Sequence, residues 1–565
     1  MVSTQNQLLY ALLVIAICMI GYRGLPSQPW TYDDLDHIEA AQKAQTDWTM
    51  LFSAEAKEPT RWMLNLYFFT AFKIFGENPT GYHTVNIPLH ALNALLVAHL
   101  ILNLFQRPLL AGISGLLFAL NCVGYEAVYE ISATGVLLGT ATALSSVLFV
   151  CRYLRTNATI DAIIAALFYA TTLFCYESFA SVLSPILYLW WIKKRHDYRL
   201  PLILCAPLLL FLLIDQVVYD TASGKVAFNA IAFGWHVIYN FGFFLTRLFL
   251  NAHLTPTGWD GPPPFDVPGI QYDAYALWGG ILFALLLFLC RRHLVIRFAT
   301  VWVTATLIPY IFSTQQFYFS RYWYLATVGS SLLATLFIVG FLSRLISQEK
   351  MVYASITAII ALTTAFSFQK MQYYEGRFLT HAGNFHLDHR HNASYAIELY
   401  EHARDKYHIH TPMLYNNLAA AFIETNQFER ALQTLISLIQ KRPDYANSYR
   451  QLATVRVHQN QYEKALQAYV HAAELDPTFL ADLHRFADGR LIQKQNAEAL
   501  EAYQHVLRID PSYTNIHLCL LNIGRILHTL GQTQQAIPFL QRALEIHPEF
   551  STAEQLLKQI QNRMK

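Results

Sequence analysis

The sequence is poor in charge. Lysine, arginine, aspartate and glutamate make up 14% of its 565 residues, whereas an ordinary soluble protein has about 25%. Apolar runs of about 17 to 25 residues, the length that crosses the hydrocarbon of a bilayer, recur between residues 7 and 367. From about residue 375 the chain turns charged and polar. This pattern excludes an ordinary soluble domain for the first part and predicts a multi-spanning membrane part followed by a soluble one.

Cysteine and basic tracts are also scarce, which limits the classes of function. Six of the seven cysteines lie in or beside apolar segments. Only Cys519 lies in the polar part, so a disulfide within that part is excluded, and no cysteine spacing of the zinc-binding kind occurs. The formal net charge is +2 and no long basic tract is present, so nothing indicates a nucleic-acid partner.

The apolar runs predict an all-α fold, a polytopic membrane helix bundle of about eleven spans. The first run, LLYALLVIAICMIGY, lacks a basic n-region and a small-x-small cleavage site, so we expect it to remain as an anchor. Two aromatic-rich stretches are expected to lie along the outer membrane surface instead, 61–75 and 229–250. The expected spans are 7–22, 82–105, 108–122, 134–151, 159–175, 177–192, 199–217, 275–290, 296–313, 322–343 and 351–367.

Positive charges orient these spans. Short basic segments follow alternate spans, which places all of them on the cytoplasmic side. Because the number of spans is odd, the polar C-terminal part then lies outside, in the periplasm or an organelle lumen. The loops that contain DDLD, NCVGYEAVYE and QQFYFSRYWY, and the proline-rich stretch 251–273, face the same side. The basic segments are Arg107, Arg152 with Arg155, KKRHDYR, CRRHLVIR and SRLISQEK.

The polar part repeats itself over residues 411–549. Four prolines end the units and are 34, 34 and 37 residues apart; an alanine precedes each proline by twelve residues, and a further small residue precedes each alanine by twelve. Small residues at this spacing let the two helices of a unit approach closely, and proline ends the second helix. The prolines are Pro443, Pro477, Pro511 and Pro548; the alanines are Ala431, Ala465, Ala499 and Ala536; the earlier small residues are Ala419, Ala453, Ala487 and Gly524.

These units, such as NQYEKALQAYVHAAELDPT, resemble tetratricopeptide repeats. The resemblance implies an α-solenoid whose concave surface binds extended peptides or partner proteins. We expect three domains: a membrane domain over 1–370, a connector with a degenerate repeat (392–407) over 371–410, and the repeats over 411–565. The three extra residues of the last unit are expected between Pro511 and Gly524, in a turn or helix start. A passive spacer is the alternative role for the array.

A polar stripe runs along the second expected span. His83, Asn86, His90 and Asn93 fall within a sector of roughly 80° on a helix. Polar side chains in hydrocarbon face the bundle interior or a wet cavity. His83, Asn86 and His90 are therefore candidate substrate contacts, with hydrogen bonding between helices as the alternative that is favoured for Asn86 and Asn93. The two histidines are about 10 Å apart along a helix, too far for one metal ion.

Carboxylates gather in the outward loops. The segment TYDDLDHIEAAQ contains Asp33, Asp34 and Asp36, and NCVGYEAVYE contains Glu126 and Glu130. Helix capping explains one of the three aspartates, most simply Asp33. Another could act as a general base toward an acceptor hydroxyl, and Asp34 with Asp36 could hold a divalent cation.

Arginine supplies the complementary charge. Arg321 stands among aromatic residues, next to Tyr322, and its guanidinium fork fits phosphate oxygens. Arg61, which enters the aromatic stretch 61–75, is a weaker candidate for the same task. The alternative for Arg321 is an interfacial arginine whose head reaches into water.

Together, an acidic pair after the first span, an aromatic interfacial helix and about eleven spans resemble the GT-C-type glycosyltransferases. The segments FGENPTGYHTVNIPLHALNALLV and SRYWYLATVGSSLL, and the order of membrane part and repeats, look like the transmembrane and tetratricopeptide-repeat O-mannosyltransferases and their bacterial relatives. The resemblance implies Asp33 or Asp34 as catalytic acid–base, Glu126 as a second acidic group, and Arg321 as a contact to the lipid phosphate of a polyprenyl-phosphate-linked sugar.

The chain departs from that family at two places. Pro59, Thr60 and Arg61 stand where an Arg-Pro pair is common, and ISATGVLL after Glu130 lacks an Arg-Asp pair, so the donor sugar stays open. Four clear repeats favour a bacterial inner-membrane relative with periplasmic repeats, or lumenal repeats in the endoplasmic reticulum if the source is eukaryotic.

Three functions follow from these observations. The first is sugar transfer from polyprenyl phosphate to a protein hydroxyl on the periplasmic or lumenal side, with the repeats recruiting the acceptor. The second is transfer to a glycan or lipid acceptor. The third is a non-catalytic, membrane-anchored repeat scaffold for envelope protein assembly. A divalent cation is the one cofactor for which the sequence offers ligands.

Overall fold

The computed structural model describes residues 4–53, 56–121, 124–194, 197–217, 241–242, 244–245, 248, 270–290, 293–311 and 320–564. Every regular element in these ranges is a helix, as the sequence predicts. The chain divides into two compact units, Met1–Ala382 and Gly383–Lys565, and the division falls within the expected connector. Each unit is described by itself.

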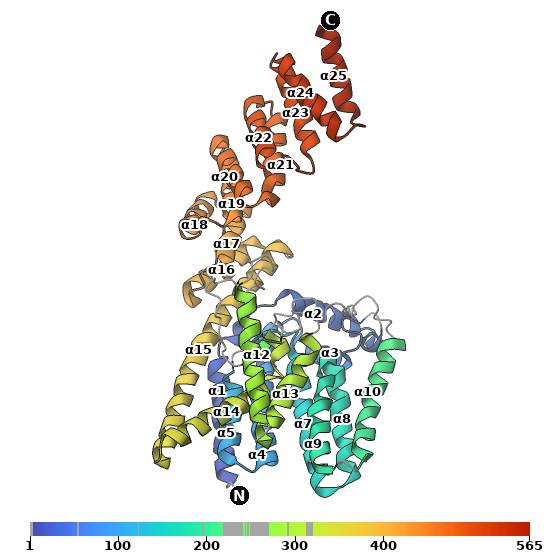
Figure 1. Ribbon diagram of the computed structural model, residues 1–565, viewed down its shortest axis with the longest axis vertical. Coiled ribbons are helices and arrows are strands. Elements are labelled where there is room, and N and C mark those ends of the chain that lie inside the picture. The colour runs from blue at the N-terminus through green and yellow to red at the C-terminus, as the bar shows by residue number, and fades with distance from the viewer. Residues whose placement is uncertain are drawn as a thin grey trace. The chain divides into compact units, whose positions relative to one another are not determined.

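The first unit is a bundle of long helices that run side by side (Figure 1). Its core is apolar, and the last helix, α15, continues into the second unit. The helices are α1 (Thr4–Gly21), α2 (Tyr32–Ala44), α3 (Trp62–Phe75), α4 (Pro79–Phe105), α5 (Pro108–Ala119), α6 (Glu126–Tyr129), α7 (Thr134–Thr156), α8 (Thr159–Cys175), α9 (Leu183–Lys194), α10 (Arg199–Val217), α12 (Ile270–Cys290), α13 (Leu294–Ile311), α14 (Thr327–Leu345) and α15 (Glu349–Asp388).

Seven helices among the described residues are long and apolar enough to cross a membrane, judged by length and composition alone. They match seven of the expected spans. Three other expected spans correspond to shorter apolar helices, and the span 177–192 divides into a 3-10 helix, Glu177–Val182, and α9. The count of about eleven spans is therefore not confirmed. The seven are Gln5–Ser27, Pro79–Phe105, Thr134–Thr156, Arg199–Gln216, Leu294–Ile311, Thr327–Leu345 and Glu349–Asp388.

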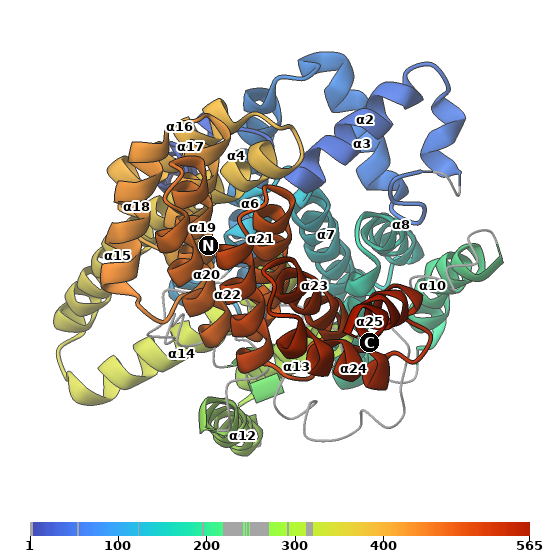
Figure 2. The same ribbon diagram turned by 90° about the horizontal axis from the view of Figure 1, so that it is seen from above.

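Helices α2 and α3 lie at the end of the bundle away from the N-terminus (Figure 1) and run beside each other when this end is viewed from above (Figure 2). They share a small apolar core in which Ile38 of α2 packs with Leu64 and Phe68 of α3. Helix α3 covers the stretch predicted to be interfacial, 61–75. Most of the second such stretch, 229–250, and of the proline-rich stretch 251–273 lies outside the described residues.

The second unit consists of paired antiparallel helices. The seven alanines expected at helix contacts are all fully buried, and a Cβ atom on Gly524 would lie 2.8 Å from Leu540, so close approach at these positions is confirmed. The first paired helix after Pro511 begins at Ile516, two residues later than its counterpart after Pro477, and this accounts for most of the three-residue insertion. The helices are α16 (Ala393–Tyr407), α17 (Pro412–Glu424), α18 (Phe428–Lys441), α19 (Ala446–His458), α20 (Tyr462–Leu475), α21 (Leu480–Ile492), α22 (Asn496–Ile509), α23 (Ile516–Thr529), α24 (Thr533–Ile546) and α25 (Ser551–Met564).

Candidate functional site

Three segments far apart in the sequence meet around the Arg321 guanidinium. Arg321 Nη1 pairs with Glu130, which directly follows α6, and Nη2 lies 3.6 Å from Oδ2 of Asp33 in the first turn of α2. The Arg321 backbone N–H donates to Glu126 Oε2 at 3.3 Å. The structure thus brings together three residues that the sequence singles out, Asp33, Glu126 and Arg321. We call these three residues, together with Glu130, the acid–arginine cluster.

The members of the acid–arginine cluster differ in exposure and charge. The Asp33 side chain is 52% exposed, whereas that of Arg321 is 14% exposed. Burial raises the pKa of Glu130 above its usual value, although the Arg321 guanidinium opposes this rise. Burial alone would lower the pKa of Arg321, but Glu130 and Tyr322 raise it above its usual value, so the guanidinium stays charged. Asp33 is the exposed carboxylate of the cluster, whereas Glu126 and Glu130 are partly buried.

Asp34, the neighbour of Asp33, is fully buried, and hydrogen bonds within the protein hold its carboxylate. Its Oδ1 accepts a hydrogen bond from the Ser132 backbone N–H at 2.8 Å, and its Oδ2 accepts from the Thr31 backbone N–H and hydroxyl at 3.0 and 2.8 Å. Helix α2 therefore begins with a capping box in which Thr31 is the N-cap and Asp34 the third helical residue. The expectation that Asp33 caps this helix is wrong, because the helix starts one residue before it, at Tyr32.

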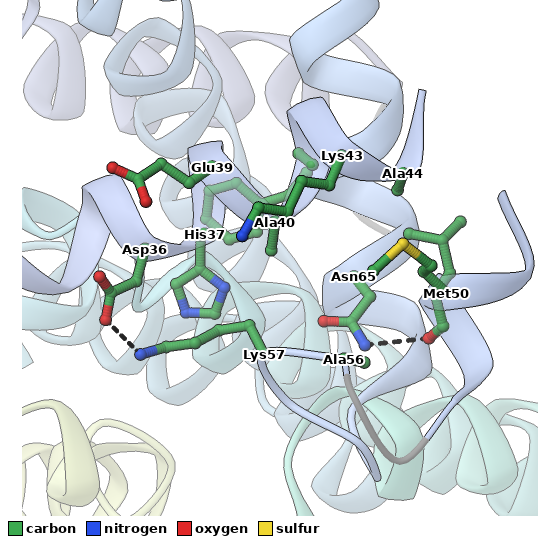
Figure 3. Close-up of a pocket in the computed structure, with 13 residues that line it drawn as sticks. Asp36, His37, Glu39, Ala40, Lys43, Ala44, Met50, Ala56, Lys57 and Asn65 are labelled. Atoms are coloured by element: carbon green, nitrogen blue, oxygen red, sulfur yellow. Dashed lines mark hydrogen bonds and ion pairs between the residues drawn. The ribbon is translucent and has the colours of Figure 1, made fainter. Parts of the chain in front are cut away.

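Asp36 lies two residues after Asp34 on α2 and forms an ion pair with Lys57. Both line a cavity of about 390 Å³ between α2, the start of α3 and the segment that joins them. Figure 3 shows the Asp36–Lys57 pair at its edge and His37, Lys43 and Asn65 around it. Alanines, Met50, Leu51 and Phe68 supply the apolar part of the lining. The cavity thus has a charged edge and an apolar wall, close to the acid–arginine cluster along the same helix.

The proposed metal ligands are not brought into one place. Asp34 points into the protein toward Ser132, and Asp36 pairs with Lys57. Among the residues that the structure describes, no three histidine, cysteine, aspartate or glutamate side chains lie close enough together to hold a metal ion.

Arg61 forms an ion pair with Glu177, a residue that the sequence did not single out as functional. Its guanidinium donates to both oxygens of Glu177, at 2.8 and 2.7 Å, and lies 4.4 Å from the Tyr176 ring centroid. In the sequence, Glu177 is the first residue of an expected apolar span, 177–192. A lone carboxylate at the edge of an apolar run is the signal that could have identified it, since such a charge needs a partner.

The polar stripe of α4 is buried and binds neighbouring segments. Asn86 donates to the carbonyl oxygens of Val128 and Glu130 at 3.1 and 3.4 Å and accepts from Thr134 at 2.8 Å. His90 bonds to Tyr324 and to the Ala119 carbonyl at 2.7 and 3.1 Å, and His83 is fully buried near Phe378. Asn86 therefore supports the backbone of the segment that carries Glu126 and Glu130.

Two family models match the second unit. Residues 416–478 and residues 480–549 each match a model described as a tetratricopeptide repeat. The C-terminal region is a tetratricopeptide-repeat array. Such repeats commonly bind peptide or protein partners, so a protein partner is consistent with this part of the chain.

Solved structures similar to the chain include other repeat proteins. YrrB, described as a TPR protein with an unusual peptide-binding site, is 18% identical over 32% of this chain and 91% of its own, with a TM-score of 0.24. TTC0263, a thermophilic TPR protein of Thermus thermophilus, is 16% identical over 33% and 98%, with a TM-score of 0.21. Yeast Tom70 is 12% identical over 85% and 95%, with a TM-score of 0.23. No curated protein matches the sequence. The assignment of the tetratricopeptide-repeat array therefore rests on the two family models.

Proposed function

We propose that the protein is a membrane glycosyltransferase. It moves a sugar from a polyprenyl-phosphate donor to a hydroxyl group of a protein that the tetratricopeptide-repeat array recruits. The observation that supports this proposal best is the acid–arginine cluster, in which the half-exposed Asp33 lies 3.6 Å from the partly buried, charged Arg321. A base and a phosphate-binding cation side by side are what such a transfer needs.

In the proposed reaction Arg321 binds the donor phosphate. Its guanidinium offers forked donors that match phosphate oxygens. As the bond between the sugar and the phosphate oxygen breaks, the acceptor oxygen bonds to the sugar carbon and its proton passes to Asp33. Polyprenyl phosphate leaves with the electron pair.

The membrane setting belongs to the same proposal. The seven long apolar helices support a first unit that is embedded in a bilayer. Helices α2 and α3 carry polar and aromatic residues at one end of the bundle, which suits the membrane surface. We place this end and the tetratricopeptide-repeat array on the periplasmic side of a bacterial inner membrane, or in the lumen of the endoplasmic reticulum if the source is eukaryotic.

A non-catalytic scaffold is the second candidate, and the tetratricopeptide-repeat array favours it. Sugar incorporation distinguishes the two functions. The purified protein, reconstituted in lipid nanodiscs, is incubated with a radiolabelled polyprenyl-phospho-sugar and envelope proteins from its host. Labelled protein is the expected product. If no donor sugar enters any protein while envelope proteins still bind to the array, the scaffold is the function. Label in glycan or lipid alone would point to the other class of acceptor.

A further inference from the structure

One pattern of hydrogen bonds recurs along the tetratricopeptide-repeat array. Each set of bonded residues has three members. The first lies on the first helix of a unit, directly after its buried small residue, and the second is a tyrosine on the second helix, four residues after its alanine. The third lies on the first helix of the next unit, two positions before its small residue. We call each such set a rung. The Asn384 rung comprises Asn384, Tyr400 and Asn417, and the Asp488 rung comprises Asp488, Tyr503 and Asn522.

In both rungs the tyrosine hydroxyl and the later asparagine donate to one oxygen of the first residue. Tyr400 Oη and Asn417 Nδ2 both donate to Asn384 Oδ1, each at 2.8 Å. Tyr503 Oη donates to Asp488 Oδ1, and Asn522 Nδ2 lies 3.4 Å from the same oxygen and 2.9 Å from Tyr503 Oη. Between them, Thr454 and Tyr469 occupy the equivalent positions, with their hydroxyl oxygens 3.4 Å apart.

The Asn384 rung also shows where the array starts. Gly383 occupies the small-residue position, and a Cβ atom there would lie 2.6 Å from the Tyr400 ring. The last turns of α15 therefore act as the first helix of an additional unit, with α16 as its second helix. Apart from the tyrosines, the residues of the rungs, Asn384, Asn417, Asp488 and Asn522, lie on first helices. Such solenoids bind partners on an extended concave surface.

The two rungs differ by one charge. Asp488 stands where the other rung has Asn384, and its side chain is 46% exposed. Within the described residues neither lysine nor arginine pairs with it, whereas the nearby Asp482 pairs with Arg485 at 3.1 Å. The closest basic group is His484 Nε2 at 3.6 Å, and burial lowers the pKa of His484, so this imidazole is mostly neutral at pH 7. Among the residues that the structure describes, the Asp488 carboxylate is thus oriented by neutral donors and has no lysine or arginine partner.

We propose that the Asp488 rung binds a lysine or arginine side chain of an extended polypeptide that lies along the first helices of the array. Tyr503 and Asn522 hold the carboxylate in place before the partner arrives, which lowers the entropy that binding must overcome. The neutral Asn384 rung contributes no such charge preference. This inference does not depend on sugar transfer, because an acceptor and a scaffold partner would be bound alike.

Two matched peptides test the charge preference. Each is a fluorescent glycine- and serine-rich peptide of about twelve residues with blocked ends, and the two differ only in a central lysine or glutamine. Their binding to the full-length protein in detergent is followed by fluorescence anisotropy at low salt. We expect the lysine peptide to bind roughly two- to fivefold more tightly, the range of a partly exposed ion pair.

Two variants make the test specific. Asp488→Asn gives this rung the same three residue types as the Asn384 rung, which the fold already accommodates, and should abolish the preference. Asp444→Asn removes an exposed carboxylate that pairs with Arg442 elsewhere in the array and should leave it unchanged. The proposal is wrong if wild type binds both peptides equally, if neither peptide binds at millimolar concentration, or if the preference survives in Asp488→Asn.

Discussion

Two adjacent aspartates at the start of α2 have opposite surroundings. Both Asp34 oxygens accept backbone N–H groups, from Ser132 and Thr31, and the side chain is buried. Asp33 is half-exposed beside Arg321. Because a carboxylate that is fully occupied by backbone donors cannot also take a proton from a substrate without breaking the helix start, Asp33 is the base in the proposed reaction and Asp34 a structural residue.

The structural role of Asp34 predicts a loss of stability. In Asp34→Asn an amide NH₂ replaces one of two oxygens that face N–H donors, so one donor is left unsatisfied at a cost of about 1–3 kcal/mol. Thermal unfolding of the purified protein in detergent should show this loss. Asp36→Asn is the control, since Asp36 is 39% exposed in an ion pair and its removal should change stability by less than about 1 kcal/mol. Equal melting temperatures for the two variants would refute the structural role.

Stability should also depend on His37. This histidine is buried against the Phe68 ring, with centroids 4.5 Å apart, and burial, with help from Lys57 and Arg61, lowers its pKa from 6.5 to about 3. The folded state therefore holds the neutral ring. Above pH 6.5 this histidine costs no stability. Below pH 6.5 the unfolded chain takes up a proton that the buried ring cannot, so the free energy of unfolding falls as the pH drops toward 3, by about 2 kcal/mol at pH 5.

The variant His37→Phe isolates this contribution, because it keeps a ring on Phe68 but cannot take up a proton. Melting temperatures of wild type and variant are compared from pH 7.5 to pH 5. The wild type should lose more stability than the variant over this range, and parallel curves would show that His37 is not the titrating group.

From the sequence, the residues of the acid–arginine cluster could be assigned to one side of the membrane but not to one site. Charge placement puts Asp33, Glu126 and Arg321 in loops on one side. It could not separate Asp33 from Asp34, because the partner that distinguishes them, Ser132, is 98 residues away in the chain. Glu177 was missed for the same reason, since its partner Arg61 is 116 residues away.

At the scale of elements, glycines in helices test the packing of the array. Gly383 contacts the Tyr400 ring so closely that a Cβ atom would lie 2.6 Å from it, whereas nothing lies within 4 Å of the corresponding position on Gly489. Gly383→Ala should therefore destabilise the protein by about 1–3 kcal/mol through overpacking. Gly489→Ala should stabilise it by about 0.5–1 kcal/mol, because alanine loses less backbone freedom in a helix.

Chemical denaturation of the two glycine variants checks both signs, with tyrosine fluorescence and circular dichroism as signals. If Gly383→Ala is as stable as the wild type, then α15 and α16 do not pack as a unit of the array.

Element types were easier to predict from sequence than element lengths. The repeat period predicted the helix pairs because the spacing of small residues and prolines reflects local packing. The spans were harder, since a hydropathy pattern does not show that residues 177–192 break into two helices at Val182. The start of the array inside α15 was missed because Gly383 and Asn384 lie in a helix with no proline to mark the unit.

At the scale of the whole molecule, the proposal requires the tetratricopeptide-repeat array to lie outside the cytoplasm. A reporter that is active only in the periplasm, fused after Lys565, should be active in a bacterial host. The same reporter fused after Asn157, in the basic loop that follows α7, should be inactive. Activity of the second fusion but not the first would show the opposite orientation. The array would then lie in the cytoplasm, away from the side on which the proposed transfer takes place.

The rate of sugar transfer in two aspartate variants tests the proposed chemistry most directly. Asp33 and Asp36 are both exposed carboxylates on α2, but only Asp33 lies beside Arg321. With a polyprenyl-phospho-sugar and an acceptor protein at saturating concentration, Asp33→Asn should reduce transfer by at least about 100-fold, the range of a lost general base. Asp36→Asn should retain a rate within roughly threefold of wild type. Equal rates for Asp33→Asn and wild type would contradict the assignment of Asp33 as the base and, with it, the proposed mechanism.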